Sequence, residues 1–167
     1  RPQEASRLID RAAFERIGRV VCSDTPRTIH TAQYLMDTGA VQCPWMSYEP
    51  NLRPWNVADF TGKEKTPERV AEFMKYIEDP NLVIPGGESR NQLRERVQVI
   101  WSYVLAPYKG LLTACFIHNS VIKSLMGLDD IKDAVQPAGV VAVYLGEKGD
   151  LSFEVVLGAV EPEIGVS

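Results

Sequence analysis

The chain has 167 residues, of which 45% are hydrophobic and 24% charged, a balance that excludes a disordered or fibrous protein and predicts one globular domain over residues 1–167. Its net charge of −4, with acidic and basic residues interspersed, argues against nucleic acid or an anionic membrane as the main partner. No apolar run reaches the roughly 18 residues that cross a bilayer.

The chain has three cysteines, Cys22, Cys43 and Cys115, without a Cys-x-x-Cys spacing. An odd number in this pattern favours neither a disulfide framework nor a zinc site, and it predicts reduced thiols. Because the N-terminus carries no signal peptide or lipidation motif, we expect a cytoplasmic protein. The sequence implies no metal and no cofactor, and it leaves the oligomeric state open.

The first part of the chain is predicted to form a helix, a strand and a second helix. Apolar residues at three- and four-residue spacing predict an amphipathic helix over residues 5–17 that ends at Gly18. Residues 19–22 are rich in valine, which predicts a short buried strand. Pro26 suits the first turn of the second helix, over residues 26–37.

The middle of the chain contains a long loop between regular elements. A short strand is predicted over residues 46–48, and residues 49–66 show no sustained periodicity. Loops of this length often carry functional residues. Helices are predicted over residues 67–78 and 89–108, on either side of a Pro-Gly-Gly turn.

The last part contains the clearest strand. Residues 111–117 are almost continuously apolar, as in a central strand covered on both faces, and they end at His118. A helix over residues 119–126 follows, and strands over residues 139–145 and 151–157 predict a hairpin at the edge of the sheet. This order of elements predicts an α/β fold, a three-layer αβα sandwich with a mostly parallel central sheet.

Polar residues follow the two best predicted strands at the points where each strand ends. Ser23, Asp24 and Arg27 follow the first, and His118 and Asn119 follow the second. Ligands gather at the carboxyl ends of strands in such sheets, so we expect the two groups to share one pocket. A guanidinium beside a helix N-terminus suits phosphate oxygens, and an imidazole can donate to the same anion. The predicted phosphate-binding residues are Ser23, Arg27, His118 and Asn119.

Four segments resemble, in order, the motifs of the histidine-phosphatase, phosphoglycerate mutase-like superfamily. Residues 23–32 are similar to its Ser-x-x-x-Arg-Ala-x-x-Thr-Ala pattern, with a threonine in place of the first alanine. Residues 52–62 resemble its Leu-x-Glu loop, residues 85–89 its Gly-Glu-Ser turn, and residues 111–118 the strand that delivers its second pocket histidine. The resemblance implies the phosphoglycerate mutase-like fold.

The resemblance also implies a phosphomonoester hydrolase, in which a histidine of an Arg-His-Gly motif attacks phosphorus and forms a phosphohistidine. Arg27 and His118 match the residues that hold the phosphoryl oxygens of a small phosphorylated substrate. The chain contains no Arg-His-Gly, because its only histidines are His30 and His118. In the family that motif ends the first strand, so we expect this strand and the nucleophile to lie upstream of Arg1.

The general acid is a second departure from the family pattern. Pro54 stands where many members place the glutamate that protonates the leaving group, and proline cannot donate a proton. Asp59 and Glu88 are the alternative acids in the neighbouring motifs, and the sequence does not choose between them.

Simpler interpretations remain for single residues. Arg27 alone would be interpreted as a surface residue of a helix capped by Asp24, and His118 as a capping or core histidine. Glu88 alone would be interpreted as a partner of a helix dipole. A cysteine phosphatase using Cys22 is disfavoured, because four residues separate Cys22 from Arg27 where that class has five.

The main rival to an enzyme is a non-catalytic module that keeps the same pocket and binds a phosphorylated ligand. The missing nucleophile and Pro54 favour it. A mutase is the less favoured enzyme, because it must also retain and place a second substrate hydroxyl.

Overall fold

The computed structural model describes residues 17–105, 112–127, 139–145 and 151–157. Its centre is a three-stranded parallel sheet in the order β2-β1-β3, formed by β1 (Ile17–Cys22), β2 (Met46–Tyr48) and β3 (Leu112–Phe116). In its register, Cys22 at the end of β1 pairs with Tyr48 on one side and Phe116 on the other. The three carboxyl ends therefore meet at one edge of the sheet.

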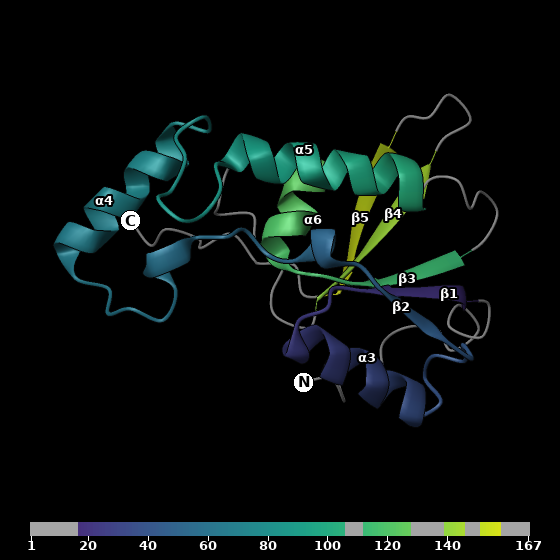
Figure 1. Cartoon of the computed structure of the whole chain (residues 1–167). Coiled ribbons are helices and arrows are strands. Elements are labelled where there is room, and N and C mark those ends of the chain that lie inside the picture. The colour runs from purple at the N-terminus through teal and green to yellow at the C-terminus, as the bar shows by residue number, and fades with distance from the viewer. Residues whose placement is uncertain (1–16, 106–111, 128–138, 146–150, 158–167) are drawn as a thin grey trace, which may run out of the picture.

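Helices cover both faces of this sheet (Figure 1). Val20 and Val21 of β1 are 1% and 0% exposed, and their side chains belong to two different cores because successive strand residues point to opposite faces. Val20 packs with Leu35 of α3 (Pro26–Asp37). The mixed α/β fold with a parallel central sheet, predicted from the sequence, is confirmed.

The second core lies between the sheet and two other helices, α5 (Arg90–Ile100) and α6 (Asn119–Met126). Its buried members, drawn from β1, the long loop and these helices, are Val21, Leu52, Leu93, Val97, Ile100 and Val121. His118 directly precedes α6, so the packing of α6 in this core determines the position of His118 after β3.

Local sequence signals explain where the helices begin and end. Helix α4 (Pro67–Glu78) starts after Thr66, whose side chain accepts from the N–H of Arg69 at 3.4 Å. Helix α5 begins with a reciprocal capping box between Ser89 and Gln92. Helix α6 ends at Gly127, whose φ of 67° is the left-handed conformation that glycine adopts without strain.

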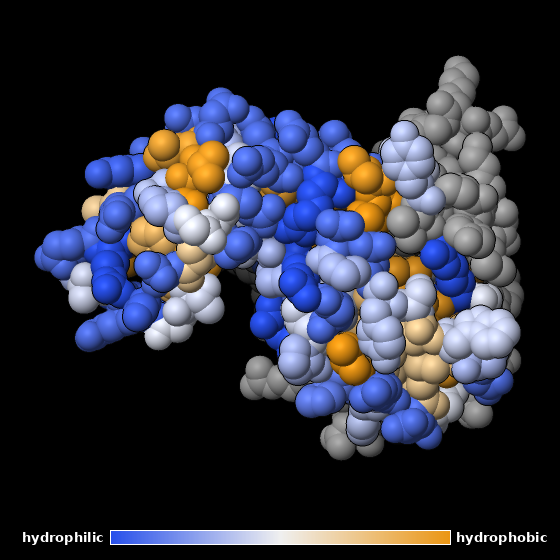
Figure 2. Space-filling view, in the orientation of Figure 1, coloured by the Kyte–Doolittle hydropathy of each residue, from blue (hydrophilic) through white to orange (hydrophobic). Residues whose placement is uncertain are grey.

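The long predicted loop contains two short 3-10 turns, η1 (Pro50–Leu52) and η2 (Ala58–Phe60). Helix α4 projects away from the sheet beside η2 (Figure 1). Phe73 of α4 contacts Trp55 and Phe60 of the loop, with ring centroids 5.4 and 5.1 Å apart. Figure 2 shows hydrophobic side chains at the surface of this projecting part of the molecule.

Two element boundaries differ from the sequence prediction. Ile17 was expected in a helix ended by Gly18, but both residues belong to β1, and the rest of that predicted helix lies outside the described residues. Ile17 packs in the core with Val20, and the register shifts between Ile17 and Arg19, so the glycine marks a strand irregularity rather than a helix end. Helix α5 ends at Ile100 and continues as a π-helical turn over Trp101–Leu105.

The predicted hairpin forms from β4 (Val140–Leu145) and β5 (Leu151–Leu157), which pair antiparallel. In the described residues these strands make a separate two-stranded sheet, so the expectation that they extend the edge of the central sheet is wrong. Alternation and turn residues determine hairpin pairing locally, whereas docking on another strand depends on contacts that are distant in sequence. None of the described helices combines the length and the apolar character needed to cross a membrane.

Candidate active site

The ends of β1 and β3 bring Ser23 and His118 together, as the sequence predicted. The N–H of Ser23 donates to the carbonyl oxygen of Phe116 at 2.9 Å, which extends the strand pairing by one residue. His118 Nε2 lies 3.1 Å from Ser23 Oγ and 3.1 Å from Thr25 Oγ1. Ser23 and His118 are 0% and 8% exposed, so water competes little for these hydrogen bonds.

Arg27 binds the other nitrogen of the same imidazole. Its Nε and Nη2 lie 3.2 and 3.1 Å from His118 Nδ1. A guanidinium can only donate, so Nδ1 is the acceptor, and we assign the proton of the neutral ring to Nε2, which donates to the Ser23 and Thr25 hydroxyls. Burial, and then the charge of Arg27, lower the pKa of His118 to about 4. His118 is therefore neutral at pH 7.

Two helix N-termini converge on this cluster. Thr25 is the N-cap of α3 and His118 the N-cap of α6, and neither side chain makes a capping hydrogen bond. Neither helix carries an acidic residue in its first turn, so no carboxylate of these turns offsets the positive end of the helix dipole. Together with the exposed Arg27, this arrangement suits a tetrahedral oxyanion.

Thr28 fixes the bend between β1 and α3. It occupies the position where the motif of the resembled family has alanine, and its Oγ1 lies 2.8 Å from the carbonyl oxygens of Ser23 and Thr25 and from Thr25 Oγ1. Thr28 is 7% exposed, so its hydroxyl satisfies groups that water reaches poorly. Sequence reasoning missed both threonines, although the departure from alanine was a signal.

One of the simpler interpretations expected Asp24 to cap the helix that carries Arg27, but Asp24 does not cap it. It turns to Arg53, whose Nε and Nη2 donate to the two carboxylate oxygens at 2.7 and 2.6 Å. The hydrogen bonds from Arg53 lower the pKa of Asp24, which is thus ionised at neutral pH. A bidentate geometry within reach explains the preference, because α3 offers only backbone N–H groups.

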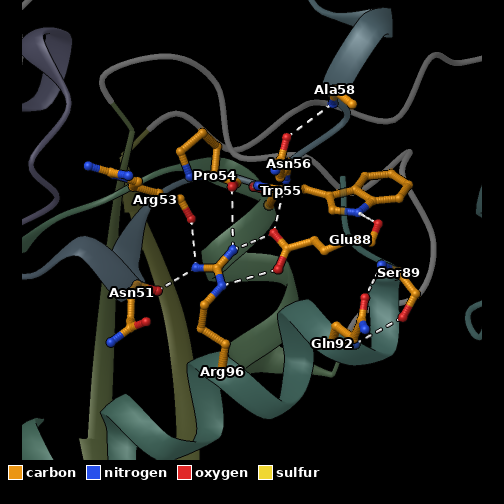
Figure 3. A network of polar contacts seen from close by, with 11 residues as sticks. Asn51, Arg53, Pro54, Trp55, Asn56, Ala58, Glu88, Ser89, Gln92 and Arg96 are labelled. Atoms are coloured by element: carbon orange, nitrogen blue, oxygen red, sulfur yellow. Dashed lines mark hydrogen bonds and ion pairs between the residues drawn. The ribbon is translucent and has the colours of Figure 1, made fainter. Parts of the chain in front are cut away.

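Across the described ranges of the chain, the other predicted residues make no hydrogen bond within this cluster. Asn119 is exposed at the first position of α6, and Asp59 is exposed on η2. Glu88 accepts from the N–H of Asn56 at 2.9 Å and from Arg96 Nη2 at 2.6 Å (Figure 3). In the described part of the chain, neither acid candidate makes a hydrogen bond to Arg27 or His118.

Cys22 adjoins the cluster but is not set up as a nucleophile. It is 0% exposed, and its Sγ donates to the carbonyl oxygen of Ser23 at 3.1 Å. Burial raises the pKa of the thiol, so the reactive thiolate is disfavoured at neutral pH. The donors that the described residues bring together here are those of Arg27, His118 and the two helix N-termini.

Several solved structures share this fold at low sequence identity. YhfR of Bacillus stearothermophilus is 19% identical, with a TM-score of 0.66 over 96% of this chain and 83% of that protein. A mycobacterial glucosyl-3-phosphoglycerate phosphatase in complex with VO3 is 16% identical, with a TM-score of 0.71 over 95% and 83%. The alpha-ribazole phosphatase of Shigella flexneri is 17% identical, with a TM-score of 0.64 over 94% and 81%.

The sequence itself points to the same family. No curated protein matches it significantly. Residues 2–131 match the family model of the histidine phosphatase superfamily (branch 1), a stretch that contains both β1 and β3 with the residues that follow them. With Arg27 and His118 joined at the ends of those two strands, the chain belongs to the histidine phosphatase superfamily.

Proposed function

We propose that the intact protein hydrolyses phosphate monoesters through a phosphohistidine intermediate, with Arg27 and His118 holding the phosphoryl oxygens. Superfamily membership supports a phosphatase-type activity. The observation that carries the proposal is the hydrogen-bonded pair of Arg27 and His118 at the ends of two parallel strands. Two structural relatives, a glucosyl-3-phosphoglycerate phosphatase and an alpha-ribazole phosphatase, support a small phosphorylated substrate.

His118 acts as a ligand of the phosphoryl group rather than as the nucleophile. Both of its ring nitrogens are engaged, Nδ1 by Arg27 and Nε2 by the Ser23 and Thr25 hydroxyls, so no lone pair is free to attack phosphorus. When a phosphate enters, Arg27 turns its donors to the oxygens, and the negative charge favours the imidazolium of His118, whose Nδ1 then donates to the anion and still offers no lone pair. The Ser23 hydroxyl and the α6 terminus at Asn119 lie beside them. These groups stabilise the charge that develops on the phosphoryl oxygens.

The nucleophile belongs to the Arg-His-Gly motif, which these 167 residues do not contain and which we place upstream of Arg1. Its imidazole nitrogen forms a bond to phosphorus while the ester P–O bond breaks, and the leaving oxygen takes a proton. Water then attacks phosphorus and returns one proton to the general acid, the N–P bond breaks, and inorganic phosphate leaves. Of the two acid candidates, Glu88 is committed to Arg96, so Asp59 is the one we propose as proton donor.

Hydrolysis of p-nitrophenyl phosphate by the 167-residue chain, and by a version extended upstream through Arg-His-Gly, tests the proposal. We expect activity only in the extended protein, and its loss in Arg27→Ala. The matched control is Arg69→Ala, which removes the same charge from the exposed surface of α4. An active 167-residue chain, or an extended Arg27→Ala variant with full activity, would refute the proposed roles.

The second candidate function is a non-catalytic module that binds a phosphorylated ligand. Pro54, at the position of the family's acid, favours it. It predicts that both versions bind inorganic phosphate, that Arg27→Ala weakens this binding by about 10- to 100-fold, and that neither hydrolyses the ester. Calorimetric titration with phosphate, run beside the hydrolysis assay, separates the two functions.

A further inference from the structure

Arg96 of α5 stands at the centre of a polar network that holds residues 51–56 (Figure 3). Its Nε and Nη2 donate to the two carboxylate oxygens of Glu88, at 3.2 and 2.6 Å. Its remaining N–H groups donate to backbone carbonyl oxygens, those of Asn51, Arg53 (3.0 Å) and Pro54 (3.4 Å). All five N–H donors of this guanidinium are therefore used.

Glu88 holds the same segment from the other side. Its Oε1 accepts from the backbone N–H of Asn56 at 2.9 Å, and its own N–H donates to the carbonyl oxygen of Asn56 at 3.0 Å. Its carbonyl oxygen accepts from Trp55 Nε1 at 2.9 Å. A Cβ on Gly87 would lie 2.3 Å from the Asn56 carbonyl oxygen, so only glycine permits this close approach.

The segment held in this way contacts residues beside both halves of the candidate site. Arg53 binds Asp24, which lies between Ser23 and Thr25 in the sequence. The backbone N–H of Trp55 donates to the Ser120 Oγ at 3.0 Å, two residues beyond His118. The path of residues 51–56 is thus tied to the ends of both β1 and β3.

We propose that Arg96 is a positioning residue, which sets residues 51–56 beside the phosphate site and so governs the binding of the organic part of a phosphate ester. This inference rests on the proposed function, because it assumes that the Arg27 and His118 pair binds the phosphoryl group. Arg96 touches neither of these residues, so it acts through the backbone of the segment. Inorganic phosphate has no organic part and does not depend on it.

The requirement is for arginine and not only for a positive charge. The Arg96 and Glu88 side chains are 19% and 17% exposed, so the pair is largely shielded from water. A lysine ammonium has three donors on one atom and cannot reach the Glu88 carboxylate and three separate carbonyl groups together. Arg96→Lys therefore keeps the charge and loses the spread of hydrogen bonds.

The experiment compares Arg96→Lys with Arg69→Lys, a control that makes the same exchange on the exposed surface of α4. Two quantities are measured on the 167-residue chain: hydrogen exchange at the amides of Trp55 and Asn56, and the Kd for p-nitrophenyl phosphate and for inorganic phosphate. Glu88→Gln is the second variant, which removes the carboxylate partner if Arg96→Lys does not fold.

For Arg96→Lys we expect faster exchange at both amides, and about tenfold weaker binding of the ester with phosphate binding changed by less than about twofold. Unchanged exchange in both Arg96→Lys and Glu88→Gln would overturn the positional role, as would an equal loss for ester and phosphate. Failure of both the wild-type 167-residue chain and its upstream-extended version to bind phosphate would overturn the proposed function and, with it, this role. The exchange data would still report whether the network holds the segment, so the two failures are distinguishable.

Discussion

Arg27 donates from Nε and Nη2 to the unprotonated Nδ1 of His118, at 3.2 and 3.1 Å. A cation thus binds a neutral ring, and in the described residues no carboxylate forms an ion pair with that guanidinium. An entering oxyanion offers Arg27 a stronger, charge-assisted acceptor than the imidazole. The Arg27 N–H groups that now donate to His118 are therefore the donors that we expect a phosphate to bind.

A tetrahedral anion should raise the pKa of His118 well above its value of about 4, because negative charge nearby favours the imidazolium. Proton NMR of the imidazole signals, titrated with and without sulfate, measures this. The chain has two histidines, and a His30→Gln variant assigns them. A His118 pKa that sulfate leaves unchanged would contradict anion binding at this site.

The depressed pKa of His118 also predicts how stability depends on pH. The pKa of a histidine in an unfolded chain is about 6.5. Between that pH and about 4, the unfolded state therefore binds more protons than the folded state. The free energy of unfolding should fall as the pH falls through this range. Urea denaturation of the wild type and of His118→Gln at several pH values tests this, and the variant should show a smaller slope.

Cys22→Ala should leave phosphate binding within about twofold of the wild type, because the thiol is buried and its raised pKa disfavours the thiolate. Native iodoacetamide should likewise label this cysteine slowly. Calorimetry measures the phosphate binding, and mass spectrometry measures the rate of alkylation. Rapid alkylation of Cys22 together with loss of binding would revive the cysteine-phosphatase alternative.

Leu52→Ala should reduce the free energy of unfolding by about 2–5 kcal/mol, because Leu52 is 2% exposed and anchors η1 in the core beneath α5. Leu82→Ala is the matched control, since Leu82 is 40% exposed and its loss should cost about 0.5 kcal/mol or less. Chemical denaturation compares the two. Equal effects would mean that the loop is not anchored through Leu52.

Ala58→Gly should stabilise the protein by about 0.5–1 kcal/mol. Ala58 has a φ of 43°, in the left-handed region where a Cβ is strained and glycine is not. The same exchange at Ala71, in the middle of exposed α4, should instead destabilise by about 0.5–1 kcal/mol. Opposite signs in thermal denaturation would confirm the strain, and a loss of stability at both positions would refute it.

The sequence predicted what depends on local patterns. Pro26 before a helical stretch and the apolar run before His118 were sufficient to place α3 and β3, and strand ends at one edge of a parallel sheet predicted that Ser23 and His118 meet. The partners of individual side chains were not predictable. Asp24 had a helix N-terminus beside it in the sequence and still paired with Arg53, 29 residues away.

Arg96 is the clearest example of what the sequence concealed. It lies on a helix among other polar residues, and no motif marked it, because its partners are carbonyl oxygens that every residue possesses. Ile17 is the opposite case: its spacing suited a helix, but packing with Val20 and pairing with Leu112 drew it into β1. At Ile17, burial and pairing with residues distant in the sequence override the helical preference of the local sequence.

The way in which Arg96 holds residues 51–56 has a consequence for how the protein can diverge. Outside Glu88, the guanidinium binds only main-chain oxygens, so the side chains of Asn51, Arg53 and Pro54 can be exchanged without removing any of its hydrogen bonds. Under the role that we propose for residues 51–56, new substrate preferences arise by replacing side chains while the backbone path stays the same. The backbone of residues 51–56 keeps its position while its side chains vary.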